Sequence, residues 1–232
     1  MFGKHRKAIT FSFDDGNIDD VRLVKLLNKY GLKATFNLCS GKLADGETWD
    51  YICKDKTVKT VHHFNFSEYQ NLYDGHEVAS HTVNHFHLEN LTEEAVYNEI
   101  NLDKIYLKSL YGYEIEGMAL PFGTWNECVL EQLKRANIKY CRAGKSTYVF
   151  DLPNELPLLN PTCHFMDSKI DELVDTFIND DSDKSMLFYI WGHSYELVTE
   201  NDWQKFEEVC KKLSGKSDVY YCTNIEAIKN YK

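Results

Sequence analysis

Two adjacent carboxylates and a pair of histidines have the residue types and spacing that suit metal chemistry. Asp14 and Asp15 follow a run of apolar and small residues and precede Gly16. Carboxylates that share a site push their pKa values apart, so one can hold a cation while the other accepts a proton. The alternative interpretation is a polar turn at Asp15 and Gly16, or Asp14 as a helix N-cap.

The histidines are His81 and His85, which come directly after another short run. Histidines four positions apart point the same way if their segment turns helically, and they then offer two imidazoles to one Zn²⁺-like ion. Asp15 is the best candidate for a third ligand, and such a set leaves a coordination position open for water. Because His76 and His87 flank the pair, surface histidines in a histidine-rich segment are the alternative.

Each of these groups follows a predicted strand, and the same pattern continues along the chain. Runs rich in β-branched and aromatic residues alternate with amphipathic segments, which indicates an α/β protein with βαβ units around a mostly parallel sheet. About seven βα repeats predict a barrel, whose active site lies at the carboxyl ends of the strands. The predicted strands are residues 8–13, 33–38, 77–80, 117–120, 139–142, 185–191 and 219–222. Helices are predicted at 18–30, from an N-cap at Thr92, at 126–136, 167–179 and 202–213, and after a Thr223…Glu226 capping box, with loops at 41–73 and 151–161.

Length and charge limit the architecture and the partners. The 232 residues suffice for one sizeable core, so we expect a single domain over residues 1–232. A net charge of -10 argues against nucleic acid and anionic membranes as partners, and no stretch approaches the roughly 18 apolar residues of a membrane span. Seven cysteines without a Cys-x-x-Cys pair, and a start that lacks a signal peptide, predict reduced thiols in a cytoplasmic protein.

Four segments of the chain resemble the motifs of the polysaccharide deacetylases, carbohydrate esterase family 4. The segments, in order, are residues 11–16, 75–85, 119–123 and 189–193. The resemblance implies a distorted (β/α) barrel that carries a divalent metal ion, usually zinc, with nickel or cobalt possible. It also implies that Asp15, His81 and His85 bind the metal ion.

The same resemblance implies the groups that move protons. Asp14 is the general base that takes a proton from metal-activated water, and His193 is the general acid. The backbone N–H of Phe122 faces the oxyanion, a role that any residue can fill because only the amide is used. Without the other motifs, a hydrogen-bonded histidine at a strand end is the alternative for His193. The implied reaction is hydrolysis of an N-acetyl or O-acetyl group on a saccharide.

Several further residues are expected around the substrate. Pro121, Trp191 and Arg142 are the predicted substrate-binding residues, and Trp125 and Tyr195 offer further ring faces on which sugars stack. Each of these aromatic side chains has an ordinary role in the core or at the rim as its alternative.

The sequence departs from the family pattern at two places. Ala119 stands where family members usually have an arginine that holds the base. Arg142, at the end of the following predicted strand, is the candidate to replace it, and an ordinary surface charge is the alternative. The aspartate-tryptophan motif that tunes the acid is also not evident, and residues 150–153 and 161–164 are the candidates for its place. His164 has substrate binding and a structural role as its two interpretations.

These departures keep two other functions open. One is a carbohydrate-binding module with impaired catalysis, and the other is a metal-dependent hydrolase of a non-sugar amide, because the chemistry is indifferent to what carries the acyl group. Specificity is expected in the loops 41–73 and 151–164. The absence of a leader favours a soluble saccharide or a small molecule over a cell-wall polymer.

Overall fold

A parallel sheet of nine strands is the centre of the computed structural model, which describes residues 1–231 except 44–46, 66, 68, 70 and 153–155. The strands are β1 (Lys7–Asp15), β2 (Ala34–Leu38), β5 (Glu77–Ser80), β6 (Gly117–Ala119), β7 (Tyr140–Arg142), β8 (Leu158–Leu159), β9 (Cys163–His164), β10 (Met186–Gly192) and β11 (Val219–Tyr221). They run in the order β8-β7-β6-β5-β2-β1-β10-β9, and β11 pairs with the first residues of β1.

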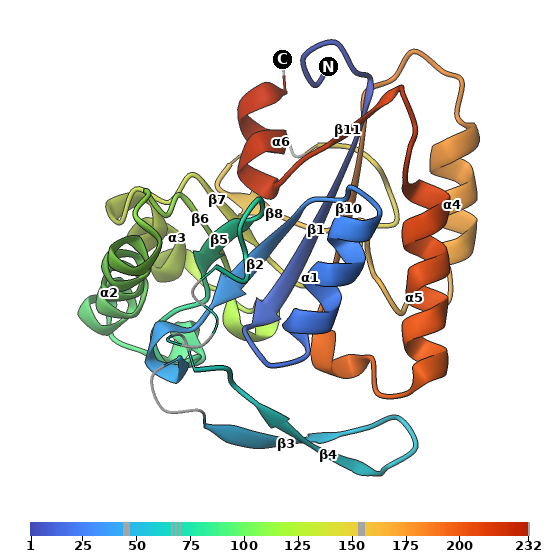
Figure 1. The fold of residues 1–232 in the computed structure, drawn as a ribbon. Coiled ribbons are helices and arrows are strands. Elements are labelled where there is room, and N and C mark those ends of the chain that lie inside the picture. The colour runs from blue at the N-terminus through green and yellow to red at the C-terminus, as the bar shows by residue number, and fades with distance from the viewer. Residues whose placement is uncertain (44–46, 66, 68, 70, 153–155, 232) are drawn as a thin grey trace.

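The sheet curls with helices outside it (Figure 1), as the predicted deacetylase-type barrel requires. The prediction of about seven strands omitted β8 and β9, which are only two residues long. A two-residue strand has no periodic pattern that a sequence can reveal. Within the described residues, β8 and β9 end the two edges of the sheet without pairing with each other, so the barrel is open between them.

The helices lie where the sequence predicted them, with ends shifted by a few residues. They are α1 (Asp20–Lys29), α2 (Glu93–Tyr111), α3 (Glu127–Arg135), α4 (Ile170–Asn179), α5 (Glu200–Leu213) and α6 (Asn224–Asn230). The predicted Thr92 cap and the Thr223–Glu226 capping box are both present. Helix α5 begins before the predicted residue 202 because Thr199 caps it, with Asp202 as the reciprocal partner.

The side chains of strand β1 alternate between the core beneath the outer helices and the interior of the curled sheet. Successive side chains of a strand point to opposite faces. Ile9, Phe11 and Phe13 are buried in the large core shared with the outer helices, and Phe11 and Phe13 both pack edge-on against Phe206 of α5. The residues between them face the interior of the curled sheet. Thr10 there donates a hydrogen bond to Asn224 of α6, at 2.7 Å.

The predicted loop 41–73 contains a hairpin of β3 (Thr48–Ile52) and β4 (Val58–His62). It forms a separate two-stranded sheet beyond the ends toward which β1 and β2 point (Figure 1). The prediction of a loop was wrong here. Each strand has only five residues, and the apolar Ile52 and Val58 lie on the exposed face, so apolar side chains do not mark one face clearly. Parts of both predicted loops, residues 44–46, 66, 68, 70 and 153–155, lie outside the described residues.

Two expectations from composition can be compared with the coordinates. All seven cysteines are free thiols, and six of them are buried. No helix in the described part of the chain is long and apolar enough to cross a membrane.

Candidate functional site

The two carboxylates at the end of β1 reach the same place because of an unusual backbone conformation. Asp14 points to the interior and is 3% exposed. Regular alternation would send Asp15 to the opposite face. The φ of Asp15 is 76°, however, and this left-handed conformation turns the strand so that its side chain also joins the site. There Asp15 accepts a hydrogen bond from the Tyr195 hydroxyl, at 3.2 Å.

Asp15, His81 and His85 form a candidate metal centre. The Asp15 Oδ1 atom lies 3.6 Å from His81 Nε2 and 3.5 Å from His85 Nε2. The three potential ligand atoms all lie within 4.8 Å of one another. Ligands on tetrahedral zinc, at about 2.1 Å from the ion, are about 3.4 Å apart. The donor set and its spacing therefore fit a divalent ion with two imidazoles and one carboxylate.

The histidine pair converges through a turn and not through a helix. The segment after β5 has no helical residues, and Thr82 and His85 have φ values of 69° and 58°. The Thr82 hydroxyl accepts a hydrogen bond from the backbone N–H of His85, at 3.0 Å, which holds the turn. The spacing of four thus brings the rings together by a different route from the helical one that we considered.

The contacts of the histidine rings suit metal ligands. His81 Nδ1 lies 2.9 Å from the carbonyl oxygen of Ala119 and donates to it, which leaves Nε2 as the ring nitrogen that faces Asp15. Burial and the neighbouring His81 lower the pKa of His85 to about 4, which keeps its ring neutral. Both nitrogens that face Asp15 are therefore available for coordination.

Asp14 is held as a buried carboxylate by two donors. Asn37 Nδ2 donates to Oδ1 at 2.8 Å, and Arg142 Nη2 donates to Oδ2. Burial alone would raise the pKa of Asp14, but the charge of Arg142, with smaller contributions from His81 and His193, lowers it. Asp14 is thus ionised, and its orientation is fixed.

The position of Arg142 bears on the missing arginine at Ala119. In the register of the sheet, Arg142 of β7 is the partner of Ala119 of β6. Its guanidinium is buried, stacks 4.5 Å from the centre of the Trp191 ring, and contacts Asp14. A cation therefore reaches Asp14 from the strand beside Ala119, at the same level of the sheet. At 1% exposed, Arg142 faces the base and not an open substrate groove.

His193 approaches the same Asp14 oxygen as Arg142 and is held by a carboxylate that was not predicted from the sequence. Its Nε2 is 3.9 Å from the nearer oxygens of Asp14 and Asp15. Its Nδ1 lies 3.1 Å from Glu196 Oε2, which also lies 2.8 Å from His164 Nε2. Burial would lower the pKa of His193, but the hydrogen bond to Glu196 and nearby negative charges raise it to about 9.

The surroundings of Glu196 explain why it stays ionised. The backbone N–H of Met166 donates to His164 Nδ1, so the Nε2 of His164 is protonated and donates to Glu196. Glu196 also accepts a hydrogen bond from the backbone N–H of His193. Burial opposes its ionisation, yet these donors hold the pKa of Glu196 far below its usual range.

Two segments were expected near the acid, and they lie in different places as far as their described residues show. His164 belongs to the predicted segment 161–164 and bonds to Glu196. Phe150, from the other segment, packs on Phe177 and Phe188 in the core. Glu196 lies three residues after His193, and its carboxylate accepts from the His193 N–H as a capping glutamate does. A glutamate at that spacing was the available sequence signal.

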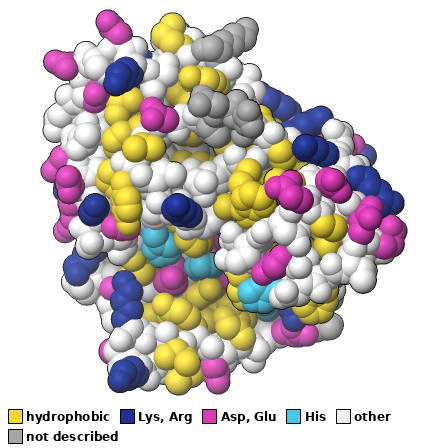
Figure 2. Space-filling view, turned by 180° about the vertical axis from the view of Figure 1, so that it is seen from behind, with side chains coloured by type: hydrophobic (Ala, Val, Ile, Leu, Met, Phe, Trp, Pro, Cys, Tyr) yellow, Lys and Arg dark blue, Asp and Glu magenta, His cyan; other side chains and the backbone are white. Residues whose placement is uncertain are grey.

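Phe122 and an open cavity complete the site. Phe122 has a φ of 58° in the turn that begins at Pro121, and its ring stacks on His87 with centroids 3.7 Å apart. A cavity of about 450 Å³ opens beside the metal ligands. Figure 2 shows histidine side chains gathered around this hollow, with hydrophobic side chains on its flank. The lining residues are Asp15, Cys39, Lys42, Glu47, Thr48, Trp49, His63, Asn84, His85, Phe122 and Tyr195.

Sequence comparison assigns this arrangement to a family. The model of the polysaccharide deacetylase family matches residues 3–141, which is more than half of the chain. The chain belongs to the polysaccharide deacetylase family. It is similar to the protein named "Putative polysaccharide deacetylase YxkH" from Bacillus subtilis (strain 168), with 25% identity over 143 residues. That match covers 61% of this chain and 45% of YxkH, which is less than half of the relative's length.

Solved structures of polysaccharide deacetylases and related esterases share the fold. Peptidoglycan deacetylase PdaC from Bacillus subtilis superposes with a TM-score of 0.58 and 18% identity, over 97% of this chain and 91% of PdaC. A family 4 acetyl xylan esterase from Clostridium thermocellum, in complex with a cobalt ion, gives a TM-score of 0.61 at 14% identity. That match covers 96% of this chain and 91% of the esterase. The family and the distorted barrel predicted from the motifs are thereby confirmed.

Proposed function

We propose that this polysaccharide deacetylase family member is an active metal-dependent deacetylase that hydrolyses N-acetyl or O-acetyl groups on a saccharide. One observation carries the proposal: Arg142 reaches the carboxylate of Asp14 from the strand beside Ala119. The missing family arginine is the strongest sequence argument against catalysis. A buried guanidinium on the base supplies the same charge from the neighbouring strand, so the argument loses its force.

Asp15, His81 and His85 would hold the metal ion, which we expect to be zinc, with nickel or cobalt as alternatives. When bound, a divalent ion there polarises the acyl carbonyl and lowers the pKa of water. The family and the fit of the three donors support this assignment. The carboxylate of Asp15 is oriented for it by the Tyr195 hydroxyl.

The proton transfers are assigned to Asp14 and His193. Asp14 is ionised because Arg142 and Asn37 stabilise its charge, so it can take a proton from the attacking water. Glu196 holds the imidazolium of His193 with Nε2 toward the two aspartates, where it can give a proton to the leaving amine or alcohol. The backbone N–H of Phe122 is assigned to the oxyanion.

The extent of the catalytic unit and the substrate class also belong to the proposal. The family match ends at residue 141, but β10 and β11 pair with β1, and His193 follows β10. We therefore propose that residues 1–232 form one catalytic domain. The names of PdaC and the acetyl xylan esterase support an acetylated polysaccharide or a fragment of one as the substrate.

An acetate-release screen tests this function. The protein is stripped of metal, reconstituted with Zn²⁺, Ni²⁺ or Co²⁺, and assayed on N-acetylated and O-acetylated saccharides and on small acetamides. We expect metal-dependent acetate release from at least one saccharide. Release from small amides alone would favour a non-sugar amide hydrolase. Saccharide binding without release would favour a binding module and would overturn the proposal.

A further inference from the structure

The hairpin β3–β4 presents one face to the body of the molecule and the other to solvent. On β3, Trp49 and Tyr51 point inward, while Ile52 on the outer face is 70% exposed. The Trp49 ring lies 4.4 Å from His63 and 5.4 Å, edge-on, from Tyr195. Tyr51 contacts the same Tyr195 ring at 5.1 Å. The aromatic face of the hairpin therefore rests on Tyr195.

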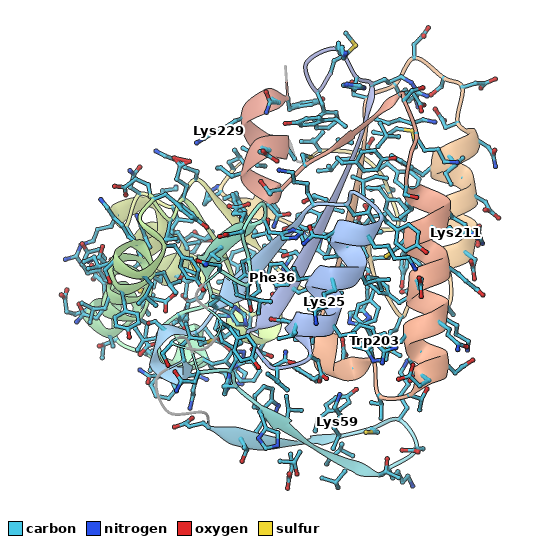
Figure 3. The ribbon with its side chains drawn as sticks, viewed as in Figure 1. Lys25, Phe36, Lys59, Trp203, Lys211 and Lys229 are labelled. Atoms are coloured by element: carbon cyan, nitrogen blue, oxygen red, sulfur yellow. The ribbon has the colours of Figure 1, made fainter. Side chains whose placement is uncertain are left out.

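Polar bonds fix the hairpin over the site. Lys59 of β4 donates to Asp19 Oδ2 at 2.8 Å and to the carbonyl oxygen of Tyr195 at 3.0 Å. Figure 3 shows Lys59 on the hairpin, directed toward the body of the molecule. The backbone N–H of Ile18 donates to the carbonyl of His62 at 2.9 Å. These three bonds attach the hairpin to the loop after β1 and to Tyr195.

Trp49 and the candidate metal centre line the same cavity. Its wall contains Trp49 from the hairpin, Asp15 and His85 from the metal centre, and the exposed Phe122 on the third-motif turn. A contact chain joins the two parts: the Trp49 ring touches Tyr195, whose hydroxyl donates to Asp15. A ligand against Trp49 is therefore beside the metal ligands.

Apart from Cys39 and Tyr195, the other wall residues are polar and of both charges. They are Lys42, Glu47, Thr48, His63 and Asn84. Lys42 and Glu47 form an ion pair at 2.7 Å, so neither sign of charge dominates this rim. A mixture of donors and acceptors next to an aromatic ring suits a neutral ligand with hydroxyl groups along its edge and apolar C–H groups on its face.

We propose that Trp49 is a specificity-determining residue that stacks on a sugar ring of the substrate, with the polar rim binding that sugar's hydroxyl groups. The inference rests on the proposed deacetylase function, and it assigns the saccharide part of the substrate to the hairpin side of the metal centre. The acetyl group then projects from this ring toward the metal ligands. A small acetyl compound makes no use of Trp49.

The test compares Trp49→Ala with wild type on two substrates, the best saccharide from the acetate-release screen and ethyl acetate, whose acetyl group is carried by no ring. For Trp49→Ala we expect kcat/KM on the saccharide to fall about tenfold, mainly through KM, because ring stacking is worth about that factor. On ethyl acetate kcat/KM should change less than about twofold, since that substrate has no ring that could stack on Trp49. Trp49→Phe should recover most of the saccharide activity.

Ile52→Ala, on the outer face of the same strand, is the matched control and should behave as wild type on both substrates. Unchanged saccharide kinetics in Trp49→Ala would overturn the inference. An equal loss on both substrates would also overturn it, because Trp49 would then support the metal centre.

If the wild type releases no acetate, calorimetric binding of an N-acetylglucosamine trimer tests the inference instead. Weaker binding by Trp49→Ala than by wild type supports the inference, and equal or undetectable binding by both contradicts it.

Discussion

The metal-binding side and the acid–base side of the site are assembled from the chain in different ways. Asp15, His81 and His85 come from two compact motifs and themselves carry the potential ligand atoms, while Tyr195 and the Ala119 carbonyl only orient them. The acid–base side depends on partners from distant segments, because Arg142 lies 128 positions from Asp14 and His164 lies 32 from Glu196. A departure from a family motif therefore matters less on this side, where a neighbouring strand can supply the missing group.

The largest expected effects separate the two sides by metal content. His81→Ala should lose both the metal ion and activity, because it removes a ligand. Asp14→Asn should keep close to one metal equivalent while acetate release falls about 10²–10⁴-fold, the usual contribution of a general base. Metal analysis and acetate assays on the same preparations check this. Retained activity in Asp14→Asn would remove the base assignment.

The second prediction tests the replacement of the family arginine. Arg142→Met should reduce activity and cost about 3–5 kcal/mol in unfolding free energy, because it leaves the Asp14 carboxylate buried and unpaired. The double variant Arg142→Met/Asp14→Asn should recover most of that stability and none of the activity. Urea unfolding and acetate assays measure the two effects. An Arg142→Met variant as stable and active as wild type would refute the role of Arg142 as the cation that holds Asp14.

A swap variant sharpens the same point. Ala119→Arg/Arg142→Ala returns the arginine to the strand on which the family carries it, at the same level of the sheet. We expect it to be more active than Arg142→Ala alone, because either position can reach Asp14. Equal activity of the single and double variants would mean that only β7 can supply the cation.

The third prediction concerns the support of the acid. Glu196→Gln keeps the shape but removes the charge that orients His193, and kcat should fall about 10–100-fold, as for other carboxylates that orient a functional imidazole. KM and metal content should stay near their wild-type values. Steady-state kinetics and metal analysis distinguish this outcome from general misfolding, which would lower metal content as well.

The smallest effect on activity is expected from a buried carboxyl group whose titration changes stability instead. Asp20, at the start of α1, accepts hydrogen bonds from Ser194, next to the acid, and from Tyr73. Burial raises its pKa from an ordinary value of 3.8 to about 7. The folded protein therefore holds this proton up to about pH 7, whereas the unfolded chain releases it near pH 4. This group's contribution is most favourable below pH 4 and declines as the pH rises toward 7.

Asp20→Asn removes that pH dependence. Its stability relative to wild type should rise between pH 4 and pH 7, by up to the order of 4 kcal/mol. Unfolding free energies measured across this range at constant ionic strength provide the check. A constant difference between the two proteins would show that Asp20 titrates normally in the folded state.

The same contrast explains which parts of the fold and of the site could be predicted from the sequence. Strand ends, helix caps and the two motifs that carry the metal triad follow from local patterns, since each depends on residues close together in the chain. The Arg142–Asp14 pair and the contact of His164 with Glu196 depend on which strands become neighbours, and periodicity does not determine that. The register that brings Arg142 beside Ala119 is the clearest case. Its alternatives, a replacement cation or a surface charge, could be distinguished only by the sheet.

The backbone conformations that bring the site residues together could not be predicted from residue types. Adjacent strand residues should face apart, so a shared site for Asp14 and Asp15 depends on the left-handed conformation at Asp15. The convergence of His81 and His85 likewise depends on left-handed residues in the turn that joins them. Neither conformation has a distinctive sequence signal at these residue types.

The most direct test of an active metal centre is a titration of the metal-free wild-type protein with Zn²⁺, followed by acetate release from the best saccharide substrate. The account predicts that activity rises in proportion to bound metal and reaches its maximum at one equivalent. One equivalent of bound zinc without acetate release from any acetylated saccharide or amide would contradict it.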